Sequence, residues 1–218
     1  MISHDFGSIS TIAGERPRPA FELLLGGLTF DLFVMSLEPG HMHRQYVNAR
    51  DTADAGCMSS TCAVVLVPGP HLAGAEGTLL IVRALWALGA KLAGAVGAIA
   101  GVGWRPSATV RSAAAFVAAT EAWERNGSVP SPGLITFQPV LDNALQSAGL
   151  AHFTGQEVRM EPALAGDGEP AVRLGQQIAQ MLIHRGVLSA PELFTGPAGE
   201  TIRLEPSVNG RVVRVWPG

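Results

Sequence analysis

The sequence is poor in cysteine and in charge, and each shortage excludes a class of protein. Only two cysteines occur, Cys57 and Cys62, whereas a small secreted protein stapled by disulfides needs more. Charged residues make up 15% of the chain, and the formal net charge is −3. Because no stretch forms a basic stripe, the electrostatic footprint of a nucleic-acid-binding protein is absent.

Targeting and catalytic signatures are missing as well. The N-terminus has no basic segment followed by an apolar one, so no signal peptide is predicted. We therefore expect reduced thiols and a cytoplasmic location. The sequence contains neither G-x-G-x-x-G nor G-K-[ST], the loops that hold nucleotides. It also lacks G-x-S-x-G and any recognisable Cys-His signature, the usual marks of nucleophilic hydrolysis.

What the sequence does contain is enough apolar material for a sizeable core. The chain has 218 residues, of which 47% are apolar, as expected for a globular protein. One segment, residues 79–104, is apolar enough to need a membrane test. Arg83 and Lys91 interrupt it, and a central charge costs about 2.5–3.5 kcal/mol on insertion scales. We interpret the segment as a buried helix followed by a buried strand, with a membrane-associated domain as the alternative.

Strand and helix patterns alternate along the chain. Apolar runs bounded by Gly and Pro predict strands over 28–37, 62–67, 96–104, 134–140, 157–161, 201–204 and 211–216. Periodic apolar residues predict helices over 75–93, 112–125 and 170–185, the second with Ser112 as N-cap and Gly127 after its end. The Asn209-Gly210 pair predicts that the last two strands form a hairpin. Residues 41–60 are expected to form a long loop or to carry a short helix.

This order predicts an α/β or α+β fold, with a mixed sheet packed against about three helices and a closing C-terminal β-hairpin. Residues 1–27 are expected to form an irregular N-terminal arm, and 28–218 a single domain.

One family resemblance accompanies these patterns. Trp104-x-Pro106-Ser107 ends a strand, Val110-x-Ser112 precedes a helix carrying Phe116, and Gly149-Leu150-x-x-Phe153-x-Gly155-x-Glu157-Val158 runs into another strand. With the helix ending at Gly186 and the C-terminal hairpin, these features over 62–216 resemble the bacterial domain-of-unknown-function 4261 family (DUF4261). The resemblance implies a compact α/β domain and supplies no catalytic residue, cofactor or substrate.

Three groups of residues are candidate sites. His41, His43, Cys57 and Cys62 are all good zinc ligands, but their spacing matches no standard zinc motif. Cys62 also begins an apolar strand, where a cysteine is usually a small buried hydrophobe. Unrelated loop histidines and structural thiols are therefore the favoured interpretation of this group.

The turn over 67–77 places glycines before a helix, as in loops that hold anions. Its two prolines remove backbone donors, so we expect a structural connection instead. Glu157 and His152 are a carboxylate and an imidazole five residues apart, a candidate acid–base pair across a turn. The favoured interpretation is that Glu157 binds backbone amides in the turn of residues 153–156, and that His152 is solvated.

None of these groups is strong enough to predict a reaction. The leading hypothesis is a non-enzymatic protein that binds another protein or itself, in an accessory, immunity-like role, without a cofactor. Low charge and many Gly, Ala and Pro residues leave room for an apolar interface. The alternative is a small-molecule or metal-dependent enzyme that uses the region from His41 to Cys62.

Overall fold

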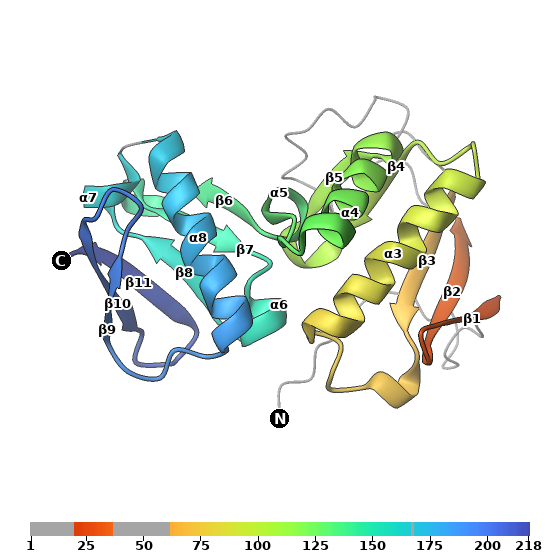
Figure 1. The fold of residues 1–218 in the computed structure, drawn as a ribbon, viewed down its shortest axis with the longest axis horizontal. Coiled ribbons are helices and arrows are strands. Elements are labelled where there is room, and N and C mark those ends of the chain that lie inside the picture. Colours follow the sequence, from red (N-terminus) through yellow and green to blue (C-terminus); the bar gives the residue numbers. More distant parts are fainter. Residues whose placement is uncertain (1–19, 37–61, 167) are drawn as a thin grey trace.

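The computed structural model describes residues 20–36, 62–166 and 168–218. These residues form two lobes, one with α3, α4 and two small sheets, the other with a six-stranded sheet and α8 (Figure 1). The fold class is mixed α/β, with a mixed sheet and a C-terminal hairpin, as the sequence predicted. None of the described helices is long and apolar enough to cross a bilayer.

The first lobe begins with a three-stranded antiparallel sheet. Its order is β1 (Phe21–Leu25), β2 (Leu28–Ser36), β3 (Cys62–Pro68). The prediction of an irregular arm over 1–27 is wrong for β1. Gly26 and Gly27 both have positive φ, 60° and 82°, as a two-residue hairpin turn requires. This Gly-Gly pair signals a hairpin, and the prediction missed it.

The helix α3 (Leu79–Ala95) lies between this sheet and the rest of the molecule. Ile81 and Leu88 pack with Phe30 of the sheet, while Val82 and Trp86 join the main core. The sequence predicted such a central helix because apolar residues surround most of it. Its N-terminus lies four residues later than predicted, since the 3-10 turn Pro70–Leu72 and a loop precede it.

A two-stranded antiparallel sheet and a second helix complete this lobe. They are β4 (Gly101–Trp104), β5 (Thr109–Ser112) and α4 (Ala113–Asn126). The Ser112 hydroxyl accepts a hydrogen bond from the Ala115 amide at 3.2 Å, and Gly127 ends α4 with φ 71°. Both caps were predicted from the sequence. The predicted strand 96–104 is shorter than expected, because β4 starts only at Gly101.

The second lobe is a six-stranded mixed sheet. Its spatial order is β6-β7-β8-β11-β10-β9, and β11 runs parallel to β8 while all other neighbours are antiparallel. The strands are β6 (Thr136–Pro139), β7 (Leu145–Ala148), β8 (Glu157–Met160), β9 (Glu192–Thr195), β10 (Thr201–Pro206) and β11 (Val212–Pro217). The predicted hairpin of the last two strands is confirmed.

One long helix, α8 (Glu169–Arg185), covers one face of this sheet. Leu174, Ile178 and Leu182 of α8 are buried against it, and Gly186 ends the helix, as predicted. Short helices fill the connections: α5 (Ser131–Leu134), α6 (Ala151–Thr154) and α7 (Pro162–Ala165). The main core runs from α3 and α4 into the six-stranded sheet, so apolar packing joins the two lobes.

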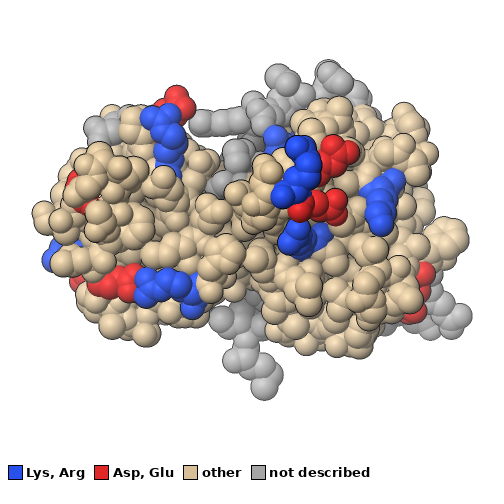
Figure 2. All heavy atoms as spheres, viewed as in Figure 1, with Lys and Arg blue, Asp and Glu red and all other residues tan. Residues whose placement is uncertain are grey.

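Charge is sparse on the surface that Figure 2 shows. Most of this face consists of uncharged residues, and acidic and basic side chains gather in a few places, chiefly on the lobe of α3 and α4. This agrees with the 15% of charged residues in the sequence.

Candidate functional site

The proposed zinc ligands are not brought together within the described part of the chain. His41, His43 and Cys57 lie outside the described residues. Cys62 is the first residue of β3 and is exposed, so the expectation that it is a buried hydrophobe is wrong. It lies at the end of β3, where it pairs with Ser36 of β2. Within 20–36, 62–166 and 168–218, no three His, Cys, Asp or Glu side chains could together hold a metal ion.

The turn over 67–77 has the geometry of a structural connection. Its amides donate to nearby carbonyls: Gly69 to Thr29 at 2.9 Å, Leu72 to Gly69 at 2.9 Å, and Ala75 to Leu72 at 3.0 Å. The Thr29 hydroxyl also lies 3.0 Å from the His71 ring Nδ1. These amides are used within the fold, so they do not form the donor cradle that an anion requires.

Glu157 holds the segment before α6 in place. Its Oε1 accepts hydrogen bonds from the amides of Gly149 and Ala151, each at 3.0 Å, and its Oε2 accepts from Leu150 at 3.3 Å. The Ser147 hydroxyl donates to Oε2 as well. The predicted bonding of Glu157 to amides is confirmed, but at residues 149–151, not 153–156. The donors are the two residues before α6 and the first residue of that helix.

Burial raises the pKa of the Glu157 carboxyl above its ordinary value, and the hydrogen bonds from Ser147, Ala151, Gly149 and Leu150 lower it in part. A raised pKa is typical of a catalytic acid as well as of a buried structural group. In Glu157 both carboxylate oxygens already accept bonds from the fold. This arrangement suits a structural role better than proton transfer.

His152 lies at the junction between the lobes. Its ring is 5.4 Å from that of Trp104 and 5.4 Å from that of Phe153, both edge-to-face. Its Nε2 atom is inaccessible to solvent. His152 is half-buried, so the expectation that it is solvated holds only in part: its ring packs against Trp104 of β4.

Close backbone approaches hold the same junction. A Cβ atom at Gly77 would lie 1.9 Å from the carbonyl oxygen of His152, and one at Gly149 would lie 2.3 Å from that of Leu134. Gly149 also has φ 105°, which favours glycine. Ser107 and Thr109 donate from their hydroxyls to the Gly133 carbonyl at 2.8 and 2.9 Å. The Gly-Leu-x-x-Phe-x-Gly-x-Glu signature thus joins the two lobes.

Besides the residues at the lobe junction, a group of polar residues lies on the six-stranded sheet. Along β8, β10 and β11, buried apolar residues of the core that includes α8 alternate with residues on the opposite side. We call this opposite side the open face. It is made by Gln138, Gln146, Arg159, Glu161, Leu193, Arg203, Glu205, Arg214 and Trp216. Leu193 is 70% exposed, and the Arg203 and Arg214 side chains are 52% and 44% exposed.

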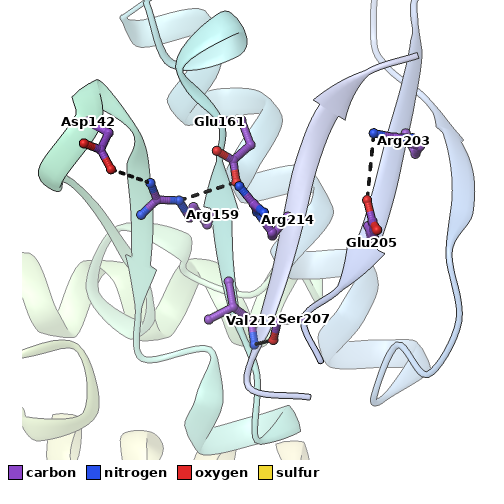
Figure 3. Close-up of polar contacts among 8 residues, drawn as sticks. All are labelled: Asp142, Arg159, Glu161, Arg203, Glu205, Ser207, Val212 and Arg214. Carbon is purple, nitrogen blue, oxygen red and sulfur yellow. Dashed lines mark hydrogen bonds and ion pairs between the residues drawn. The ribbon is translucent and has the colours of Figure 1, made fainter. Parts of the chain in front are cut away.

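A buried carboxylate organises the centre of the open face. Glu161 is only 3% exposed, and its Oε1 accepts a hydrogen bond from Arg214 Nε at 2.6 Å. Arg159 Nε lies 3.4 Å from the same oxygen. Figure 3 shows both guanidiniums turned toward Glu161, with Asp142 on the far side of Arg159 and the Arg203–Glu205 pair on β10. The hydrogen bond to Glu161 also raises the pKa of the Arg214 guanidinium.

Trp216 adds an aromatic surface beside these arginines. The Arg214 guanidinium lies 4.7 Å from the Trp216 ring centroid and that of Arg203 lies 5.9 Å from it, both within cation–π range. The strand register places Trp216 opposite Arg203, and Arg203 opposite Leu193. Arginine, tryptophan and leucine therefore form one continuous row across β11, β10 and β9.

Sequence reasoning missed the open face, although part of its signal was visible. In the predicted strand 157–161, Val158 and Met160 alternate with charged residues, which is typical of a half-exposed strand. The same alternation occurs in 201–206 and 212–217. Because β8 becomes a neighbour of β11 through a parallel pairing distant in sequence, the sequence did not show that these charges share one surface.

Comparisons with protein-family models, curated proteins and solved structures find no match for this chain. The resemblance to the domain-of-unknown-function 4261 family stays a prediction.

Proposed function

We propose that this protein acts by binding another protein through the open face of its six-stranded sheet. The observation that carries the proposal is the row of Trp216, Arg203 and Leu193, which leaves aromatic, guanidinium and aliphatic surface accessible on a rigid sheet. Tryptophan and arginine are the residues most enriched where binding energy concentrates in protein interfaces.

The position of these side chains supports binding more than catalysis. They project from three neighbouring strands, so the backbone hydrogen bonds of the sheet fix their spacing before any partner arrives. An accessory, immunity-like role in the bacterial cytoplasm is the setting we propose for this binding. The resemblance to DUF4261 proteins, which brings no catalytic residues, agrees with a non-enzymatic role.

Site-specific photo-crosslinking tests the proposal. A benzoylphenylalanine replaces Leu193 in full-length protein made in its native cells, and Leu80 on α3 serves as the matched position. The two side chains are 70% and 71% exposed, so accessibility alone does not favour either. We expect a discrete crosslinked product from position 193, lost when Trp216→Ala is added, and none of that mass from position 80. Equal crosslinking from both positions, or none from 193, contradicts the proposal.

A further inference from the structure

The two central arginines of the open face are held by the same carboxylate oxygen of Glu161. Arg214 and Arg159 both direct Nε at Oε1 of Glu161, at 2.6 and 3.4 Å. They are register partners on the parallel strands β11 and β8, so the guanidiniums lie side by side. Glu161 is buried, and a buried carboxylate fixes its donors more firmly than an exposed one.

This anchoring leaves the terminal nitrogens of the guanidiniums available. An arginine carries five N–H donors, and Nε supplies only one of them. Arg159 Nη2 lies 3.8 Å from Asp142 Oδ2, but the Asp142 side chain is 83% exposed, so solvent screens this pair. For Arg214, the described hydrogen bonds use Nε alone. The terminal nitrogens of each guanidinium, Nη1 and Nη2, form a fork of N–H donors. In Arg159 and Arg214 these forks are held in place, and among the described contacts they have no strong acceptor.

The free donors of the open face, rather than a surplus of charge, favour an acidic ligand. Arg159, Arg203 and Arg214 are paired with three carboxylates, Glu161, Glu205 and the exposed Asp142. Because Glu161 is bound by Nε and Asp142 is solvated, the terminal nitrogens of Arg159 and Arg214 can still donate to an external carboxylate. A nucleic acid is a poor fit, because binding its backbone requires many basic residues, and the chain as a whole carries −3.

From this geometry we infer that the open face recognises an acidic segment of a partner polypeptide. Its carboxylates would bind the terminal nitrogens of Arg214 and Arg159, and its apolar side chains would contact Trp216 and Leu193. A planar guanidinium pairs with a carboxylate through two parallel hydrogen bonds, which gives both strength and orientation. The inference rests on the proposed function and names the chemistry of the partner.

Fluorescence anisotropy with a labelled, glutamate-rich peptide containing leucines tests the inference. The reference peptide has every glutamate replaced by glutamine. We expect the full-length protein to bind the acidic peptide and not the reference, with affinity falling as salt rises. The Arg214→Lys variant keeps the charge but loses the fork, so its affinity should fall about tenfold or more. The control Arg173→Ala, on α8 at the other face of the sheet, should bind as the wild type does.

Stability is checked for each variant, because Glu161 loses a partner when Arg214 changes. The Arg203→Ala variant leaves Glu161 and its two anchored arginines in place, and it should still weaken peptide binding. Equal binding of both peptides, no binding of either, or an equal loss in Arg173→Ala overturns the inference. So does a phosphoserine peptide that binds far more tightly than the glutamate peptide, since that result assigns the forks to phosphate.

The two proposals fail separately. A crosslink at position 193 that persists in the Arg214→Lys variant, with no acidic peptide bound, leaves protein binding standing and overturns the acidic partner. If the acidic peptide binds but position 193 gives no crosslink, the guanidiniums do bind carboxylates, and the proposed function is wrong.

Discussion

Glycine residues at the lobe junction show how single atoms decide the packing of this protein. Gly77, before α3, approaches the His152 carbonyl so closely that a methyl group has no room. Such positions differ from glycines with negative φ in open surroundings, where an added methyl group contacts no other atom of the fold. Gly94, in the last turns of α3, has no neighbour within 4 Å of an added Cβ atom.

Gly77→Ala should therefore destabilise the protein, and Gly94→Ala should not. We expect the first change to lower the free energy of unfolding by about 1–3 kcal/mol, because α3 and α6 must move apart. The second should raise it by up to about 1 kcal/mol, since alanine favours the helix. Urea unfolding of both variants measures the difference. Equal stabilities would mean that the two segments do not approach as described.

Glu157 gives a prediction for pH. Burial raises its pKa despite four hydrogen bonds. A carboxyl whose pKa is higher in the folded than in the unfolded state stabilises the fold at low pH, and this contribution is lost as pH rises through the folded pKa. The wild type should therefore lose stability relative to Glu157→Gln, which cannot titrate, as pH rises from about 4.

Thermal unfolding of both proteins across that pH range measures the trend. A wild type that gains stability over the Gln variant as pH rises would show that the amide hydrogen bonds outweigh burial. Glu157 would then have a lowered pKa.

At the scale of elements, a buried glutamine links segments that are distant in sequence. Gln156 is 1% exposed. Its Nε2 donates to the carbonyls of Leu188 and Gly210, each at 3.0 Å, and its Oε1 accepts from the Leu188 amide at 2.8 Å. This side chain joins the start of β8, the segment after α8 and the β10–β11 turn.

Gln156→Leu should leave these three backbone groups without partners. We expect the free energy of unfolding to fall by about 2–4 kcal/mol, because unsatisfied buried polar groups are costly. The half-buried Gln138 on the open face is the matched position, and Gln138→Leu should change stability little. Chemical denaturation measures both, and similar losses would argue that Gln156 acts only by filling space.

Helix positions and caps were more predictable than strand neighbours. Ser112, Gly127 and Gly186 act through residues close in sequence, so their roles could be predicted. The strands β5, β7 and β9 were missed. Each has only four residues, as does β8, which could be predicted because apolar and charged residues alternate along it. The amide partners of Glu157 were misplaced by a few residues, and the pairing of Arg159 with Arg214 depends on a contact that no local pattern encodes.

For the whole molecule, the shared core has a consequence for unfolding. Trp86 and Trp123 of the first lobe belong to the same cluster as Val158 and Ile178 of the second. Two lobes that share a core should unfold together. We expect one cooperative transition, in which the segments of α3 and β11 lose protection from hydrogen exchange at the same denaturant concentration.

Hydrogen exchange followed by mass spectrometry across a urea series makes this comparison. Loss of protection in α3 and α4 while the six-stranded sheet stays protected would show that the lobes are separate folding units. That outcome would also argue against a single domain over 28–218.

The position of β11 also affects how the protein is made. This strand follows all the other strands in the chain, yet it lies in the middle of the six-stranded sheet, between β8 and β10. During synthesis the chain grows from its N-terminus, so β8 and β10 leave the ribosome before the strand that joins them. Until residues 212–217 emerge, both strands expose an unpaired edge and apolar side chains, which are prone to aggregation. The nascent chain should therefore depend on chaperones until residues 212–217 have emerged.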